Sequence, residues 1–314
     1  MKLFDHKDSV NQHFKTFEDL NVTIDIKRED LLHKEVSGNK LRKLRYNLKA
    51  ALDQEYSQVL TYGGAYSNHI AATAAACRIV GLSSIGIIRG EELGDTLEKT
   101  LATNQTLRTA HKNGMQLKFV SRKEYREKME VDFQAQLMLD YGVFYNIPEG
   151  GTNALAVKGA NEILTSKDLE SYDVICVAGG TGGTAAGIIN SVNEGHQVFV
   201  FSALKGDFLR RDIEKFSSDR SFELVGENHF GGYVRSNDAL IDYMNVRFRE
   251  SGIPLDPIYT GKMMYRLEQM IQQGIFNGKT RILAIHTGGL QGIPGYNQML
   301  KKKGRLQLQY EDHI

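Results

Sequence analysis

Segments rich in apolar and β-branched residues alternate with amphipathic segments along most of this chain of 314 residues. The apolar segments read NVTIDIK, QVLTYGG, SSIGIIRG, LKFVS, VFYNIP, DVICVAGG, QVFVFSA and RILAIHTGG. Helical patterns lie between most of them, as in residues 39–52, where Leu41, Leu44, Leu48 and Ala51 share one face. This alternation predicts an α/β fold of open, twisted, mostly parallel sheets with helices on both faces.

Two charged segments are predicted to be single helices. Residues 96–114 end with a glycine that stops a helix, and residues 122–141 form a charged, solvated helix. No internal repeat and no linker rich in Pro, Gly or Ser interrupts the chain. Any division into two domains must therefore come from topology.

The composition limits the partners and the compartment. Charges nearly balance, with 39 Lys and Arg against 38 Asp and Glu, which argues against nucleic acid or an anionic membrane as the main partner. No stretch reaches the length of a membrane helix, and the beginning lacks the apolar part of a secretory signal. Cys77 and Cys176 lie in apolar runs, so we expect buried free thiols, no metal site and a cytoplasmic protein.

Glycine-containing loops follow four of the predicted strands, at residues 62–68, 148–153, 178–187 and 286–292. In open α/β sheets, ligands bind beyond the carboxyl ends of the strands. One glycine turn is common at any strand–helix junction, but four favour one shared ligand site.

The loop from Gly179 to Thr184 reads GGTGGT between a predicted strand and a predicted helix. Its backbone N–H groups and the helix dipole would bind an anion, and Thr181 and Thr184 add hydroxyl donors. The spacing of Gly180, Gly182 and Ala185 also fits a dinucleotide site, so a nicotinamide-dependent oxidoreductase is an alternative. The next strand ends at Ser202 without the acidic residue that such a site needs. A cofactor with a single phosphate fits the loop better.

Lys40 stands in the segment SGNKLRK at the start of a predicted helix. Neighbouring positive charges and partial burial would lower the pKa of its amine, as a nucleophilic lysine requires. A lysine in a basic helix start is usually solvated, so this pattern alone is weak.

The order of these motifs resembles that of the fold-type II pyridoxal-phosphate enzymes, and within them the D-cysteine desulfhydrase and 1-aminocyclopropane-1-carboxylate deaminase group. The resemblance spans most of the chain and rests on IKREDL, SGNKLRKL, GGAYSNH, PEGGTNAL, the loop at 179–184, LDPIYTGK and HTGG. It implies a tryptophan synthase β-like fold with two domains. Residues 1–44 and 151–314 would form the larger, cofactor-binding domain and residues 45–150 the smaller one, with pyridoxal phosphate in the cleft between them.

The resemblance also implies roles for single residues. Lys40 would carry the cofactor as a Schiff base, and Asn68 would bind its phenolic oxygen. Ser67 and Tyr259, with Tyr233, would act on the substrate, whose carboxylate would lie near Ser67, Asn68 and His69. The phosphate would be held by Gly180, Thr181, Gly182, Gly183 and Thr184, and the ring nitrogen would face Thr260 and Thr287. The alternative is that Ser67 and Asn68 only cap a helix, although capping and a functional role are compatible.

Positions 260 and 287 bear on the reaction. The deaminases carry Glu and Leu there, whereas this chain has Thr at both, like the desulfhydrases. A threonine hydroxyl cannot stabilise a protonated ring nitrogen as a carboxylate can. We therefore predict α,β-elimination from a small amino acid, with D-cysteine giving hydrogen sulfide, pyruvate and ammonia. The alternatives are 1-aminocyclopropane-1-carboxylate deaminase and a non-catalytic relative that binds the cofactor. The resemblance further implies a homodimer.

Overall fold

The computed structural model describes residues 9–204, 206, 208–218, 220–226, 230–232, 234–276 and 278–313. The chain forms two compact units. Unit 1 comprises Lys34–Val36 and Lys40–Ala156, and unit 2 comprises the described parts of Lys7–His33, Ser37–Asn39 and Val157–Ile314. The boundaries predicted at 44/45 and 150/151 differ by several residues from these units, and the assignment of a cofactor-binding domain stays a prediction.

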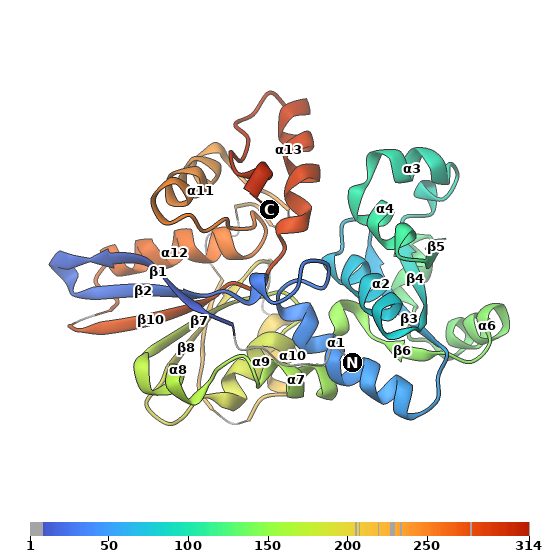
Figure 1. The fold of residues 1–314 in the computed structure, drawn as a ribbon, viewed down its shortest axis with the longest axis horizontal. Coiled ribbons are helices and arrows are strands. Elements are labelled where there is room, and N and C mark those ends of the chain that lie inside the picture. The colour runs from blue at the N-terminus through green and yellow to red at the C-terminus, as the bar shows by residue number, and fades with distance from the viewer. Residues whose placement is uncertain are drawn as a thin grey trace. The chain divides into compact units, whose positions relative to one another are not determined.

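Unit 1 is built on a four-stranded, fully parallel sheet in the order β5-β4-β3-β6 (Figure 1). The strands are β3 (Gln58–Gly64), β4 (Ser83–Arg89), β5 (Met115–Val120) and β6 (Tyr145–Ile147). The helices are α1 (Asn39–Asp53), α2 (Asn68–Val80), α3 (Leu97–Thr103), α4 (Gln105–Lys112), α5 (Arg122–Arg126) and α6 (Val131–Tyr141).

Alternation along β3 places side chains on both faces of this sheet. Val59 packs with Leu44 and Leu48 of α1 and with alanines of α2. Leu60 and Tyr62 pack on the other face, with residues of α5 and α6. Both faces are therefore buried, as expected for a parallel sheet.

The two charged segments differ from the prediction of single helices. The first breaks at Asn104, whose side chain caps α4 through the backbone N–H of Leu107. The second breaks into α5 and α6 at residues 127–130, after a capping box at Ser121. Tyr125 and Leu137 are buried in these helices, so the segment is not simply solvated.

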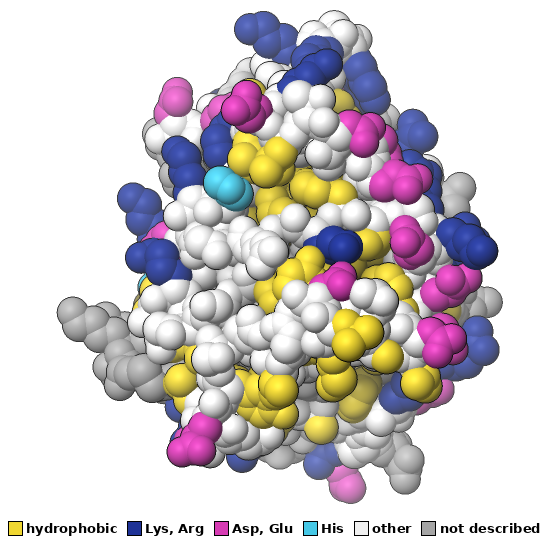
Figure 2. Space-filling view, turned by 90° about the vertical axis from the view of Figure 1, so that its right-hand side faces the viewer, with side chains coloured by type: hydrophobic (Ala, Val, Ile, Leu, Met, Phe, Trp, Pro, Cys, Tyr) yellow, Lys and Arg dark blue, Asp and Glu magenta, His cyan; other side chains and the backbone are white. Residues whose placement is uncertain are grey.

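Apolar side chains also gather on part of the surface shown in Figure 2. Among the exposed apolar residues of unit 1 are Val131, Met138 and Leu139 of α6 and Val143 just beyond it. α6 therefore carries apolar residues both toward the core and toward solvent.

Unit 2 is built on a six-stranded sheet in the order β1-β2-β10-β7-β8-β9 (Figure 1). The strands are β1 (Asn11–Phe17), β2 (Val22–Lys27), β7 (Val174–Gly179), β8 (Gln197–Ser202), β9 (Glu223–Val225) and β10 (Thr280–Ile285). The helices are α7 (Ala154–Ala160), α8 (Ser166–Ser171), α9 (Gly183–Ser191), α10 (Phe208–Glu214), α11 (Asp238–Ser251), α12 (Thr260–Gln272) and α13 (Ile293–Lys302). All pairings are parallel except that of β1 with β2, which agrees with the prediction of mostly parallel sheets.

Helices cover both faces of this sheet, as the fold class predicts. Cys176 of β7 and Ile282 of β10 pack toward α11, α12 and α13 on one face. Ile175 and Leu283 pack toward α9 and α10 on the other. Burial keeps Cys176 and Cys77 as free thiols and raises the pKa of both, that of Cys77 to about 12.

The sheet order brings three strand ends together. β2, β10 and β7 are parallel neighbours, so the segments that follow them begin at the same edge of the sheet. These segments are Arg28–Asp30, His286–Gly289 and Gly180–Thr184. This edge is where a doubly wound sheet binds ligands.

Candidate active site

Lys40 is the second residue of α1 and is 8% exposed. Burial disfavours the charged amine and lowers the pKa of Lys40 to about 8. A lysine in this state is unprotonated in a larger share of molecules near neutral pH than a solvated lysine. The predicted nucleophile therefore has the property that covalent chemistry requires.

A second lysine lies one helical turn further along α1. Lys43 is buried, and its ammonium donates to the hydroxyl of Thr152 over 2.8 Å. Burial and the charge of Lys40 hold the pKa of Lys43 well below its ordinary value. Two buried amines on one face of a helix favour an anionic ligand, because an anion would offset the cost of desolvating them.

His69 lies in the first turn of α2 and interacts electrostatically with Lys40 and Lys43. The hydroxyl of Thr61 donates to the carbonyl of Ile147, so Nε2 of His69 donates to that hydroxyl over 2.8 Å. The ring is buried, and burial with the charges of Lys40 and Lys43 lowers the pKa of His69. The histidine is thus held as a neutral ring, and its predicted contact with substrate stays a prediction.

Ser67 and Asn68 follow the end of β3 and begin α2. The hydroxyl of Ser67 accepts a hydrogen bond from the backbone N–H of Ile70 over 3.4 Å, so Ser67 caps the helix. A Cβ on Gly63 would lie 2.9 Å from that hydroxyl, which explains the glycine in this turn. Ser67 and Asn68 are partly exposed at the carboxyl edge of the unit 1 sheet, and their predicted roles stay predictions.

In unit 2, the glycine loop joins β7 to α9. Gly182 adopts φ +78°, a left-handed conformation that favours glycine, and stands before the first turn of the helix. The N–H groups of that turn have no partner within the helix and carry the positive end of its dipole. The hydroxyl of Thr184 accepts a hydrogen bond from the amide of Asn39 over 2.8 Å, so its own hydrogen remains available to an anion.

Asn39 also connects this loop to the nucleophile. Its backbone N–H donates to the carbonyl of Thr287 over 3.2 Å, and Lys40 follows it directly in the chain. A Cβ on Gly38 would lie 2.1 Å from the same carbonyl oxygen, so only glycine fits there. The backbone of residues 38 and 39 is therefore fixed against both the glycine loop and Thr287.

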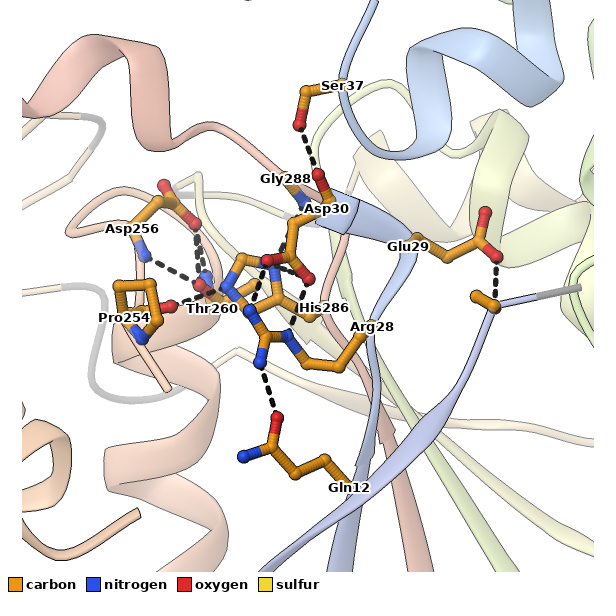
Figure 3. A network of polar contacts seen from close by, with 11 residues as sticks. Gln12, Arg28, Glu29, Asp30, Ser37, Pro254, Asp256, Thr260, His286 and Gly288 are labelled. Carbon is orange, nitrogen blue, oxygen red and sulfur yellow. Dashed lines mark hydrogen bonds and ion pairs between the residues drawn. The ribbon is translucent and has the colours of Figure 1, made fainter. Parts of the chain in front are cut away.

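The start of α12 carries Tyr259 and Thr260 beside the same loop. A Cβ on Gly180 would lie 3.1 Å from the hydroxyl oxygen of Tyr259, so the phenol approaches this glycine closely. The hydroxyl of Thr260 donates to Oδ1 of Asp256 over 2.8 Å and accepts from the backbone N–H of Asp256 over 2.9 Å (Figure 3). The hydrogen of this hydroxyl is thus already used within the protein.

Asp256 is a buried carboxylate that organises this helix start. It accepts hydrogen bonds from the backbone N–H groups of Ile258, Tyr259 and Thr260 and from the Thr260 hydroxyl, over 2.8–3.0 Å. Four donors occupy its two oxygens. Asp256 therefore serves the helix and is not a free carboxylate that could stabilise a protonated ring nitrogen.

The structure thus brings several predicted residues together within each unit. Unit 2 holds Gly180–Thr184, Tyr259, Thr260 and Thr287, and unit 1 holds Lys40, Ser67, Asn68 and His69. Tyr233 lies outside the described residues. The sequence analysis assigned no role to Asn39, Lys43, Asp256 and His286, although all four lie in the motifs SGNKLRKL, LDPIYTGK and HTGG that carry the resemblance.

Pyridoxal phosphate fits these residues. A buried amine with a lowered pKa matches its aldehyde, and the helix start at Gly182–Thr184 matches its phosphate. A Cβ at Gly180 or Gly182 would lie about 3.1 Å from Tyr259 or from the backbone of Ile213, so these two positions leave little room for a side chain.

The fold and these residues define a class of enzyme. The chain belongs to the family of pyridoxal-phosphate-dependent enzymes, whose family model matches residues 12–288. A putative 1-aminocyclopropane-1-carboxylate deaminase of Thermotoga maritima is 32% identical over 289 residues, covering 85% of this chain and 89% of the relative. A bifunctional D-cysteine desulfhydrase/1-aminocyclopropane-1-carboxylate deaminase of Arabidopsis thaliana mitochondria is also 32% identical, covering 85% of this chain and 72% of the relative.

Solved structures agree with this assignment. The crystal structure of a homologue of 1-aminocyclopropane-1-carboxylate deaminase is similar with a TM-score of 0.79 and 27% identity, covering 95% of this chain and 94% of that one. A hydrogen sulfide-producing enzyme of Fusobacterium nucleatum shares the fold, with a TM-score of 0.59, 13% identity and coverage of 92% and 98%. The predicted cofactor and fold class are confirmed. No helix of the described residues is long and apolar enough to cross a membrane.

Proposed function

We propose that this enzyme catalyses α,β-elimination on a small amino acid that carries a leaving group on its β-carbon, with D-cysteine as the model substrate. The observation that carries the proposal is the polar arrangement at the start of α12. Four donors occupy the carboxylate of Asp256, and Thr260 beside it would stand, by the resemblance, where a glutamate would strengthen the electron sink. A weaker sink suffices when a leaving group soon removes the electron density, whereas opening a cyclopropane ring demands more.

When bound, pyridoxal phosphate supplies an electron sink that acidifies the α-hydrogen of an amino acid. The amine of Lys40 would attach the cofactor and, once displaced by substrate, take up the α-proton on Nζ. A pKa of about 8 suits this task, since a general base works best when its pKa lies near the operating pH.

Other residues would orient the reactants. The N–H groups at the start of α9 and the hydroxyl of Thr184 would hold the phosphate, and Asn68 the phenolic oxygen. Ser67, at the exposed start of α2, would contact the substrate. Tyr259 would place its phenol beside Gly180 to move or hold a proton.

The net reaction balances without a further reactant. D-Cysteine and water give pyruvate, ammonia and hydrogen sulfide: the α-hydrogen leaves as a proton, and the β-sulfur leaves with the electron pair of its bond to carbon. The printed name of the Arabidopsis relative supports the desulfhydrase and the deaminase alike. The nicotinamide alternative is set aside, because the family match assigns a different cofactor.

A panel of amino acids tests the proposal. The purified enzyme with pyridoxal phosphate is incubated with D- and L-cysteine, D- and L-serine, β-chloroalanine and 1-aminocyclopropane-1-carboxylate, and the released 2-oxo acid is measured. We expect pyruvate from D-cysteine and β-chloroalanine. Release of 2-oxobutyrate from the cyclopropane substrate alone would favour the deaminase, and bound cofactor without any turnover would favour a non-catalytic relative.

Assembly and location stay predictions that rest on the resemblance. A homodimer would give twice the chain mass of 35.2 kDa in light scattering, and a monomer would contradict it. A cytoplasmic location would be contradicted by fractionation of the protein with an organelle or with the secreted material.

A further inference from the structure

His286 is a buried histidine that binds two backbone groups on opposite sides of its ring (Figure 3). Nε2 lies 2.7 Å from the carbonyl of Pro254, and Nδ1 lies 3.2 Å from the backbone N–H of Gly288. A carbonyl only accepts and an N–H only donates. The ring therefore carries its proton on Nε2, leaves Nδ1 without one, and is neutral.

Each of these bonds fixes a segment of the candidate site. The bond to Gly288 holds the turn that contains Thr287, whose carbonyl accepts the N–H of Asn39 just before Lys40. The bond to Pro254 holds the segment that leads to Asp256 and so to the start of α12. These two segments also meet directly, because a Cβ on Gly289 would lie 3.0 Å from the carboxylate carbon of Asp256.

A buried carboxylate faces the unprotonated nitrogen of this ring. Oδ1 of Asp30 lies 3.5 Å from Nδ1 of His286, and a carboxylate with no other partner there could take the place of Gly288 at that nitrogen. Arg28 prevents this, since its guanidinium binds both oxygens of Asp30, over 2.9 and 2.7 Å. Gln12 in turn accepts a bond from Arg28 over 2.5 Å. The charged groups on this side of the ring are thus Asp30 and, bound to it, Arg28.

We propose that His286 is a positioning residue for the reaction, which in its neutral form holds the Thr287 turn and, through Asn39, the start of α1 that carries Lys40. Arg28 occupies both oxygens of Asp30, so Nδ1 of His286 is left to accept from the N–H of Gly288. The proposal rests on the proposed function, because it takes Lys40 as the point of cofactor attachment.

Two substitutions separate the two bonds of the ring. In His286→Asn the side-chain oxygen can take the place of Nδ1 and accept from Gly288, whereas in His286→Gln the amide can reach the carbonyl of Pro254 instead. The rate of cofactor attachment is measured from the absorbance of the bound cofactor and from trapping with borohydride, and stability is measured by thermal unfolding.

We expect both variants to lose stability, but only His286→Gln to attach cofactor about tenfold more slowly, the size expected from one lost hydrogen bond. Equal attachment rates in the two variants would overturn the proposal, because a purely structural role predicts them.

A second set of variants tests the proposal even if substitutions at 286 prevent folding. Arg28→Met removes the group that binds both oxygens of Asp30, so that carboxylate can bind Nδ1 of His286 in place of Gly288, and cofactor attachment should slow. The double variant Arg28→Met/Asp30→Asn removes the carboxylate and should restore the wild-type attachment rate. An unchanged attachment rate in Arg28→Met, or a double variant as impaired as the single one, would contradict the proposal.

A separate experiment on Lys40 tests the proposed function independently of His286. Lys40→Ala should abolish trapping of the cofactor in every background. Trapping that persists without Lys40 would refute the attachment point, whatever the variants of His286 show.

Discussion

Two amines of α1 lie on one face, and burial acts on both. Lys40 and Lys43 would each cost free energy to protonate in the fold, and each has a lowered pKa. Lys49 on the same helix is exposed and pairs with Asp53 over 2.8 Å. Lys40, Lys43 and Lys49 differ in whether the fold buries them. The sequence of α1 alone does not reveal this difference.

The lowered pKa predicts how attachment of the cofactor depends on pH. Only the unprotonated amine can attack an aldehyde, and the pKa of Lys40 is about 8 rather than its ordinary value of 10.5. The attachment rate of the cofactor-free protein should rise with pH and level off above about 8. Stopped-flow absorbance measures the rate, and Lys49→Ala is the matched control, which should leave the profile unchanged. A rate that still rises steeply from pH 9 to 10.5 would contradict the assignment.

At the scale of the elements, glycines allow segments of unit 2 to approach each other. Gly38 has φ +66° and lies against the carbonyl of Thr287, whereas Gly81 has φ +81° at the end of α2 and no neighbour within reach of a Cβ. Both positions favour glycine for their backbone, but only Gly38 is also required by packing.

These two glycines make a matched pair of variants. Gly81→Ala should cost about 1–2 kcal/mol of unfolding free energy, the price of a left-handed alanine. Gly38→Ala should cost clearly more and also weaken cofactor binding, since its Cβ would lie 2.1 Å from the carbonyl oxygen of Thr287. Denaturant unfolding and cofactor titration measure the two effects. Equal losses of stability with unchanged cofactor affinity would show that the segment at 38–39 does not position the site.

The start of α12 gives a second prediction at this scale. Thr260 is fully buried, and its hydroxyl lies 2.8 Å from the carboxylate of Asp256. Thr260→Glu would place a second carboxylate there and should destabilise the protein by several kcal/mol, unless the glutamate takes up a proton. Thr260→Ser keeps the hydroxyl and should cost about 1 kcal/mol, for the lost methyl group. A stable Thr260→Glu protein with its carboxylate ionised would contradict the observed arrangement.

For the whole molecule, the alternation of strands and helices was enough to predict the fold class and eight of the strands, whereas the cofactor was predicted from the glycine loop, Lys40 and the family resemblance. The alternation missed the edge strands β1 and β9; β1 carries the polar side chains of His13 and Lys15 and is ordered by pairing with β2. The alternation also joined α3 to α4, because the cap at Asn104 looks like any polar helical residue.

The arrangement of the site was harder to predict than its members. The glycine loop and Lys40 have local signals, since their chemistry depends on a few adjacent residues. The network of Arg28, Asp30 and His286 joins residues more than 250 positions apart, and nothing in either segment indicates its partner. Such pairings follow from sheet order, which a single sequence does not fix.

The attachment point of the cofactor is the claim on which the account depends. The enzyme with bound pyridoxal phosphate is reduced with borohydride, digested and mapped by mass spectrometry. We predict that the cofactor is found on Lys40 alone. Among the other buried lysines, Lys43 and Lys262 also have pKa values lowered by burial, that of Lys262 to about 8, whereas Lys27 is paired with Asp168. Cofactor on any of these lysines, or on no lysine at all, would contradict the account.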